Sequence, residues 1–113
     1  MAIVNSTVAV GNNDILTVPA NARWAITTIL VCNSYDPEGA APENETSTFD
    51  LHLIPSGDPL DNSTTLIVRK LPLPAGETFT FDSEKIVLEA GDKITIVGTS
   101  PANLAVTVSY LEV

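Results

Sequence analysis

The chain contains 113 residues with a mass of 11.9 kDa, a length that predicts a single domain spanning residues 1–113. Hydrophobic residues make up 44% of it, which excludes an intrinsically disordered chain. Because 14 acidic residues oppose 5 basic ones, the net charge is −9, and we expect neither nucleic acid nor an anionic membrane as a partner.

The N-terminal residues predict no targeting segment. The sequence MAIVNSTVAV lacks the basic region and continuous apolar core of a secretory signal peptide. No apolar run approaches the roughly 18 residues that span a bilayer. We therefore expect a globular protein that is synthesised in the cytoplasm.

Residues 24–32 predict a strand, because β-branched side chains are dense there and favour a pleated surface over a helix. Simple alternation places Trp24, Ile26, Leu30 and Cys32 on one face, with Cys32 as a small buried hydrophobe. It places Ile29 and Val31 on the opposite face. A strand that is apolar on both faces is central or covered by a partner, so Ile29 and Val31 are candidate interface residues.

Residues 34–47, SYDPEGAAPENETS, predict a long polar loop, because they lack periodicity and contain two prolines and four acids. Its acids are candidate contacts with a partner: Asp36, Glu38, Glu43 and Glu45. Together with Asp50 they are also possible calcium ligands, but they lack the spacing of a dedicated calcium loop. We expect no metal and no cofactor.

The next strand, over residues 49–53, alternates Phe49, Leu51 and Leu53 with Asp50 and His52. The alternation predicts that His52, the one histidine, lies on the wetted face as a surface or interface residue. A second polar stretch follows at residues 55–65. Beyond it, Ile67 and Leu71 lie opposite apolar neighbours on their own strand, and they complete the candidate interface.

Period-2 alternation continues to the C-terminus, around Phe79, Ile94 and Val106. No segment predicts a helix. The fold class expected is all-β: an antiparallel β-sandwich of jelly-roll type with about eight or nine strands. The side chains expected inside it are Trp24, Ile26, Leu30, Phe49, Leu51, Leu53, Phe79, Phe81, Ile94, Ile96, Leu104, Val106 and Val108.

Four similar turns precede strands: Pro19-Ala20-Asn21, Pro74-Ala75-Gly76, Glu89-Ala90-Gly91 and Pro101-Ala102-Asn103. Their last residue, Gly or Asn, tolerates a positive φ. The segments that begin at Ala75 and Ala90 are alike, and both predict hairpin turns.

The turn-and-strand motifs support a family resemblance. They are Leu16–Ala20, Ile29–Asn33, Leu73–Thr78, Ile86–Ile94 and Ala102–Glu112. Taken in order, they resemble the small all-β virion structural proteins of tailed bacteriophages, such as cyanophages. The resemblance covers nearly the whole chain except the 34–47 loop. The resemblance implies an architecture similar to that of decoration, collar or tail-appendage proteins. It implies no catalytic residues in this chain.

The function expected is therefore that of a non-enzymatic virion structural protein, a capsid decoration or cement protein. The alternatives are a collar, baseplate or tail-fibre component, and a receptor- or carbohydrate-binding module. The expected partners are the major capsid protein or neck and tail proteins. Surplus apolar strand surface predicts a homo-oligomer. By analogy with the local three-fold positions of virion surfaces, we expect a trimer.

Overall fold

The computed structural model describes residues 2–39 and 45–113, which form eight β-strands and no helix. The strands are β1 (Ala2–Val8), β2 (Gly11–Thr17), β3 (Arg23–Asn33), β4 (Thr46–Ile54), β5 (Leu66–Pro74), β6 (Thr78–Glu89), β7 (Lys93–Gly98) and β8 (Leu104–Glu112). The all-β prediction is confirmed. A search of the described residues for a helix long and apolar enough to cross a membrane finds none.

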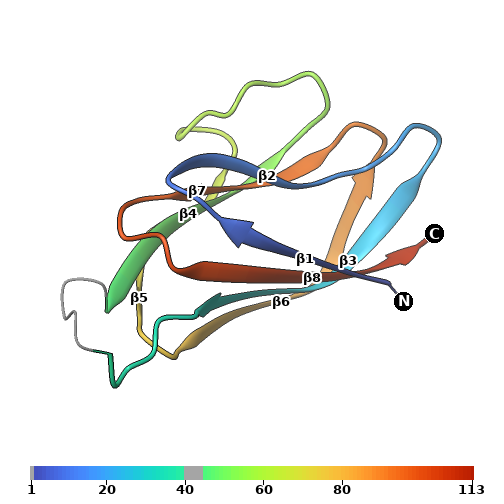
Figure 1. Cartoon of the computed structure of the whole chain (residues 1–113). Helices are drawn as coiled ribbons and strands as arrows, with labels where there is room; N and C mark the ends of the chain where they lie inside the picture. Colours follow the sequence, from blue (N-terminus) through green and yellow to red (C-terminus); the bar gives the residue numbers. More distant parts are fainter. Residues whose placement is uncertain (1, 40–44) are drawn as a thin grey trace.

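The strands form two antiparallel sheets that pack as a sandwich (Figure 1). Sheet A has the order β1-β8-β3-β6, and sheet B has the order β2-β7-β4-β5. This order is that of an eight-stranded jelly roll, in which two Greek keys close on each other. Only the connection between β4 and β5 joins neighbours within one sheet; every other connection crosses between the sheets.

Three of the four predicted turns have the expected positive φ at their last residue, and Asn103 in the fourth does not; two of the turns also have a different role. Asn21, Gly76 and Gly91 have φ of 63°, 78° and 86°. Each turn is closed by a backbone hydrogen bond from the next residue, such as Ala22 N–H to Pro19 O at 3.2 Å. The prediction that the turns at Gly76 and Gly91 make hairpins is wrong, because β5, β6 and β7 alternate between sheets. Alternation identifies buried side chains but not the neighbour of a strand.

The core lies between the sheets and is mostly aliphatic. Twelve of the 13 side chains expected there are in the core or pack against it; the exception is Leu30. The fully buried side chains of the core include Phe49, Leu51, Ile94 and Ile96. These four come from β4 and β7, the two central strands of sheet B. The period-2 pattern therefore identified the centre of the domain.

A β-bulge in β3 accounts for the exception. The register of β3 shifts between Ile26 and Thr28 against both of its neighbours, β6 and β8. Such an extra residue reverses which side chains face inward. Ile29 and Val31 are fully buried in the core, so their predicted place on the outer face is wrong. Leu30 and Cys32 face outward and are half-buried, which corrects the prediction that both point inward.

A second irregularity changes the face of Leu71. The pairing of β5 with β4 shifts between the Phe49–Leu71 pair and the Leu51–Val68 pair, next to Lys70, which has φ of 43°. Leu71 consequently packs against the core and is not a surface residue. Ile67 keeps its predicted exposure, with 45% of its surface accessible. Of the four apolar interface candidates, Ile67 alone is exposed.

Candidate functional site

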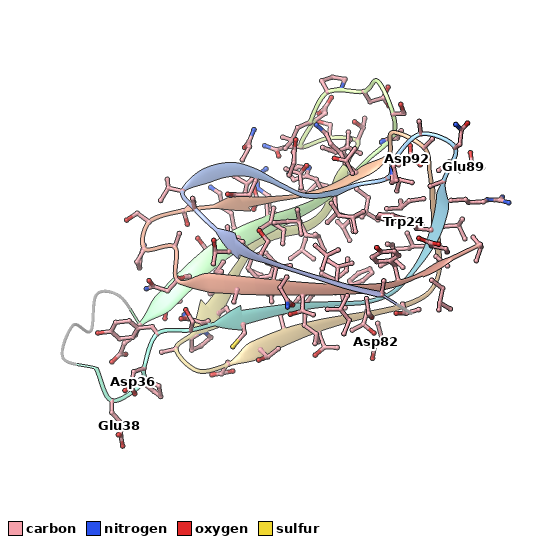
Figure 2. The ribbon with its side chains drawn as sticks, turned by 45° about the vertical axis from the view of Figure 1, so that its right-hand side comes forward. Trp24, Asp36, Glu38, Asp82, Glu89 and Asp92 are labelled. Carbon is pink, nitrogen blue, oxygen red and sulfur yellow. The ribbon has the colours of Figure 1, made fainter. Side chains whose placement is uncertain are left out.

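The outer surface of sheet A is broad and almost without charge. We call it face A. It consists of the described side chains that alternate with core residues on the four strands of this sheet: Ile3, Asn5, Thr7, Ala25, Thr28, Leu30, Cys32, Thr78, Thr80, Asp82, Val87, Ala105, Thr107, Ser109 and Leu111. Asp82, on the edge strand β6, is charged, and at one end of the face Arg23 and Glu89 continue the outward positions of β3 and β6 in the row next to Ala25 and Val87. Figure 2 labels Asp82 and, at one end of the molecule, Glu89.

The sequence gives face A its flat surface. Its central strands, β3 and β8, contribute mainly Ala, Thr, Ser and Leu outward, which are small or uncharged. The bulge places the Thr27 hydroxyl 2.6 Å from the Ser109 hydroxyl, so polar groups on the surface bond to one another across the strands. At one end of this face, Arg23 and Glu89 form an exposed ion pair with an N–O distance of 3.6 Å.

Sheet B presents a different outer surface. Asp14, Asp50 and Lys93 stand on it, and Lys93 Nζ lies 3.3 Å from Asp14 Oδ2. The connection between β4 and β5 folds back over part of this sheet, because Thr65 bonds to His52 there. The covering loop therefore distinguishes sheet B from face A.

His52 lies beneath that connection, so its predicted place on the surface is wrong. The side chain is fully buried. Its Nδ1 is 2.8 Å from Thr65 Oγ1, and Nε2 has no hydrogen-bond partner among the described residues. Burial lowers the pKa of His52 below its usual 6.5; the charge of Asp50 raises it and that of Arg69 lowers it. The sequence could not reveal this burial, because residues 55–65 are polar and gave no sign of covering a strand.

The acidic loop is attached to the sandwich by Asn33, the last residue of β3. The Asn33 side chain is buried and its Nδ2 donates to Glu45 O at 3.0 Å and to Leu73 O at 2.8 Å. Its Oδ1 accepts the Tyr35 N–H at 2.9 Å. One side chain thus holds both ends of the loop against the C-terminal end of β5. Sequence reasoning missed Asn33, which has no signal beyond its position before the polar segment.

The acids of this loop are spread out in the described residues. Asp36 and Glu38 are exposed at the end of the molecule opposite Glu89 and Asp92 (Figure 2). Asp36 Oδ1 accepts the Glu38 N–H at 2.9 Å, so this carboxylate stabilises its own turn. Glu45 is half-buried, and Glu43 lies outside the described residues.

The fifth possible calcium ligand, Asp50, lies in β4, where its Oδ1 accepts the Lys70 N–H at 2.6 Å. Over residues 2–39 and 45–113, no group of three or more His, Cys, Asp or Glu side chains is placed to hold a metal ion. The residues described therefore give the calcium alternative no positive support.

Two open hollows lie away from face A. The larger, of about 370 Å³, lies on sheet B and is lined by Asn12, Asp14, Ile54, Leu60, Lys93 and Thr95. Its carboxylate is already bound, since the Thr95 hydroxyl donates to Asp14 Oδ1 at 2.8 Å and Lys93 pairs with Oδ2. These contacts are enough to explain the polar groups of the hollow as parts of the sheet.

The second hollow, of about 290 Å³, includes Trp24 among its lining residues. The ring of Trp24 stacks on that of Tyr110, with centroids 4.0 Å apart and an interplanar angle of 20°. Both rings also pack against the core. An aromatic platform for a sugar needs an exposed ring face, and this pair uses its stacking surface internally.

The sequence and the structure therefore agree on part of the site only. Asp36, Glu38 and Ile67 are exposed as predicted, but Ile67 lies on β5 of the other sheet. A comparison with family models, curated proteins and solved structures finds no match for this chain.

Proposed function

We propose that this protein is a non-enzymatic structural subunit of a tailed-phage virion, a capsid decoration protein that attaches through face A. Face A is the observation that carries the proposal, because a chain of net charge −9 has a four-stranded surface whose described charges are Asp82 on an edge strand and the mutually paired Arg23 and Glu89 at one end. The centres of protein interfaces are depleted of charged residues, since burying a charge requires removing its water.

The architecture supports the same role. A jelly roll holds its outer strands in a fixed, hydrogen-bonded geometry, so face A can meet a partner without first becoming ordered. The turn-and-strand motifs resemble those of small tailed-phage virion proteins. This resemblance implies that the protein is synthesised in the host cytoplasm and then located in the virion. The partner that fits this role is the major capsid protein.

The placement of the acids is compatible with such attachment. Asp36 and Glu38 stand at one end of the molecule, and Glu89 and Asp92 at the other (Figure 2). Docking through face A leaves Asp36 and Glu38 in water, where they keep this end of the bound subunit negatively charged. A surface with net charge resists aggregation.

Quantitative mass spectrometry of purified phage particles tests the proposal. We expect this chain to be present at a copy number comparable with that of the major capsid protein. A copy number that is a small fraction of this value places the chain in the collar, baseplate or tail fibre, which is the alternative within the same class. Absence from washed particles overturns the virion assignment.

A further inference from the structure

We propose that the open edge of β1 pairs with the same edge of a second copy of this chain, so that the two copies of sheet A form one continuous antiparallel sheet. The inference goes beyond the proposed function and does not compete with it. The edge lies beside face A, and its bonds run in the plane of the sheet, so the outer surface of sheet A remains free.

β1 is an edge strand with a neighbour on one side only (Figure 1). All seven of its residues, Ala2–Val8, pair with β8 in an unbroken antiparallel register. In such a strand the backbone N–H and C=O groups of alternate residues point away from the neighbour. Within the part of the chain that the structure describes, no strand pairs with those groups. An edge of this kind is a template for pairing with another chain.

The other three edge strands carry features that obstruct such pairing. β5 contains Pro72 and Pro74, which lack a backbone N–H, and β2 has a charged residue, Asp14, beside a shift of its register. β6 contains the charged residues Asp82 and Glu89. Charges, prolines and bulges are the features that keep sheet edges from joining. β1, with the sequence AIVNSTV and an unshifted register, has none of them.

The chain turns away from this edge directly after β1. The Ala9 N–H donates to Asn13 Oδ1 at 3.1 Å, and Asn13 Nδ2 donates to Ala9 O at 2.8 Å. Because the backbone of Ala9 is already bonded in this way, the edge that a partner strand can use ends at Val8.

Length and symmetry together select one register for the pair. When a two-fold axis relates two antiparallel strands, one residue lies opposite its own copy. Only when that residue is Asn5, the middle of β1, do all seven residues pair. Ile3 then lies opposite Thr7 of the second copy. Both are exposed and β-branched, and such side chains pack well across paired strands.

The edge also leaves apolar side chains accessible on both sides of the sheet. Ile3, on the outer side, is 64% exposed, while Val4, on the inner side, packs against the core but is only half-buried. A neighbouring strand would cover part of both. Pairing at this edge therefore removes apolar surface from water in addition to completing the backbone hydrogen bonds.

A second copy fits this edge better than an extended segment of another protein. Both strands of the pair are already held in sheets, so neither must become ordered on binding. The strand is uncharged, so a chain of net charge −9 meets its own copy here without placing two carboxylates opposite each other. The two-fold axis is perpendicular to the sheet and keeps both face A surfaces on the same side, where both can meet one particle.

The size of the contact sets the concentrations at which pairing is visible. Seven paired residues form a strip about 23 Å long with about six to eight backbone hydrogen bonds. Main-chain hydrogen bonds supply the affinity when a strand is added to a sheet edge. Because the strip is narrower than a standard interface, we expect a Kd in the micromolar range.

Multi-angle light scattering of the whole chain, between about 10 and about 300 µM in about 0.15 M sodium chloride, tests the inference. We expect the mass to rise with concentration from 11.9 kDa towards twice that value. Asn5→Lys and Asn5→Asp each place two like charges opposite each other, and each should raise the Kd about tenfold or more. Since the two variants change the net charge in opposite directions, net charge alone cannot produce both losses. An equimolar mixture of them should recover the dimer, because the facing charges are then of opposite sign.

Thr107→Lys is the matched control. Thr107 pairs with Asn5 from β8, one strand in from the edge, and its hydroxyl donates to Asn5 Oδ1 at 2.9 Å. The control removes the same side-chain bond and adds the same charge to the same sheet, but away from the open edge. It should leave the Kd within about twofold of the wild-type value.

Hydrogen exchange reports on the edge of the wild-type chain without any substitution. The amides of β1 that point away from β8 should exchange more slowly at about 300 µM than at about 10 µM. The same protection should appear in Thr107→Lys and be absent from Asn5→Lys. Circular dichroism of each variant confirms that the subunit remains folded.

Several results overturn the inference: the mass of a monomer at the highest concentration, the mass of a trimer, a dimer that Thr107→Lys dissociates while Asn5→Lys does not, or β1 amides whose exchange does not depend on concentration. A mixture of the two Asn5 variants that stays monomeric overturns the register. A chain that is monomeric in solution yet abundant in particles overturns this inference alone. A dimeric chain that is absent from particles overturns the proposed function alone.

Discussion

Asn33 shows how a single side chain can fix a long loop to a sandwich. Its amide satisfies two backbone carbonyls and one backbone N–H from three different segments. A buried carbonyl that loses its donor costs about 1–3 kcal/mol, because water cannot replace the missing bond. The residue therefore has more effect on stability than its position beside a polar loop indicates.

Replacing Asn33 tests this role. We expect Asn33→Leu to lower the free energy of unfolding by at least about 2 kcal/mol, since the carbonyls of Glu45 and Leu73 lose their donor. Urea denaturation measures the change. Asn12→Leu, at an exposed position in β2, is the control and should change stability by less than about 0.5 kcal/mol. Equal effects of the two substitutions would contradict the anchoring role.

His52 connects burial to pH. In the neutral ring, Nδ1 shares a hydrogen bond with Thr65 Oγ1, while protonation adds an N–H at Nε2, which the described part of the chain provides with no acceptor. This arrangement explains why burial lowers the pKa of His52 in the folded protein. Below pH 6.5 the unfolded chain therefore binds a proton that the folded chain resists, and stability decreases as the pH falls.

The contribution of His52 can be isolated with a variant. We expect the urea midpoint of the wild-type chain to fall between about pH 7.5 and about pH 5.5, and His52→Leu to show a smaller decrease. The carboxylates titrate in both proteins, so the difference between the two profiles belongs to His52. Parallel profiles would show that the buried ring does not resist protonation.

The bulge in β3 determines which side chains of the strand face outward and which face the core. Thr27 is the inserted residue, because the register passes from Ile26 to Thr28, and Ile29 is consequently fully buried. Ile29→Ala opens a cavity in the core and should lower the free energy of unfolding by about 2–5 kcal/mol. Leu30→Ala removes a half-exposed side chain from face A and should cost clearly less. Thermal and urea unfolding of the two variants at low protein concentration compare them. If Leu30→Ala lowers the free energy of unfolding more than Ile29→Ala does, Leu30 faces the core and the uninterrupted alternation is correct.

The elements themselves were predictable, and their faces less so. Alternation of Phe49 with Leu51, and of Ile94 with Ile96, predicts strands and their buried side because one rule governs an unbroken strand. A bulge interrupts that rule with one residue, and Thr27 looks like any other strand residue in the sequence. Ile29 and Val31 were therefore assigned to the wrong face, and face A was not foreseen.

The pairing between strands could not be predicted from the sequence, for a different reason. The turns at Gly76 and Gly91 have the conformation predicted for them, but a tight turn can join two strands of one sheet or pass between two sheets. The choice depends on how whole sheets pack, which no local pattern encodes. Strand number and spacing predicted a sandwich or barrel, whereas the position of each strand in the jelly roll required the structure.

At the scale of the molecule, unbalanced charge opposes folding. The sequence has nine more acids than bases, and folding brings Asp36 with Glu38, and Glu89 with Asp92, to the two ends. Dissolved salt screens repulsion between exposed charges over about 10 Å at 0.1 M.

We therefore expect the melting temperature to rise when sodium chloride is increased, and differential scanning calorimetry measures it. The comparison is made between about 10 mM and about 100 mM sodium chloride, where the screening length falls from about 30 Å to about 10 Å. A melting temperature that falls with salt would indicate that ion pairs such as Lys93–Asp14 outweigh the repulsion.

The interleaved strand order has a consequence during protein synthesis. β8 lies between β1 and β3, so the earliest strands of sheet A gain their shared neighbour only when the last strand has been made. Sheet B likewise joins β2 to β4 only through β7. A nascent chain that still holds β8 inside the ribosome exposes unpaired strand edges, which invite aggregation. The two sheets should therefore complete their folding only after β8 has left the ribosome. Chaperones that bind nascent chains and shield unpaired strands should raise the yield of soluble protein.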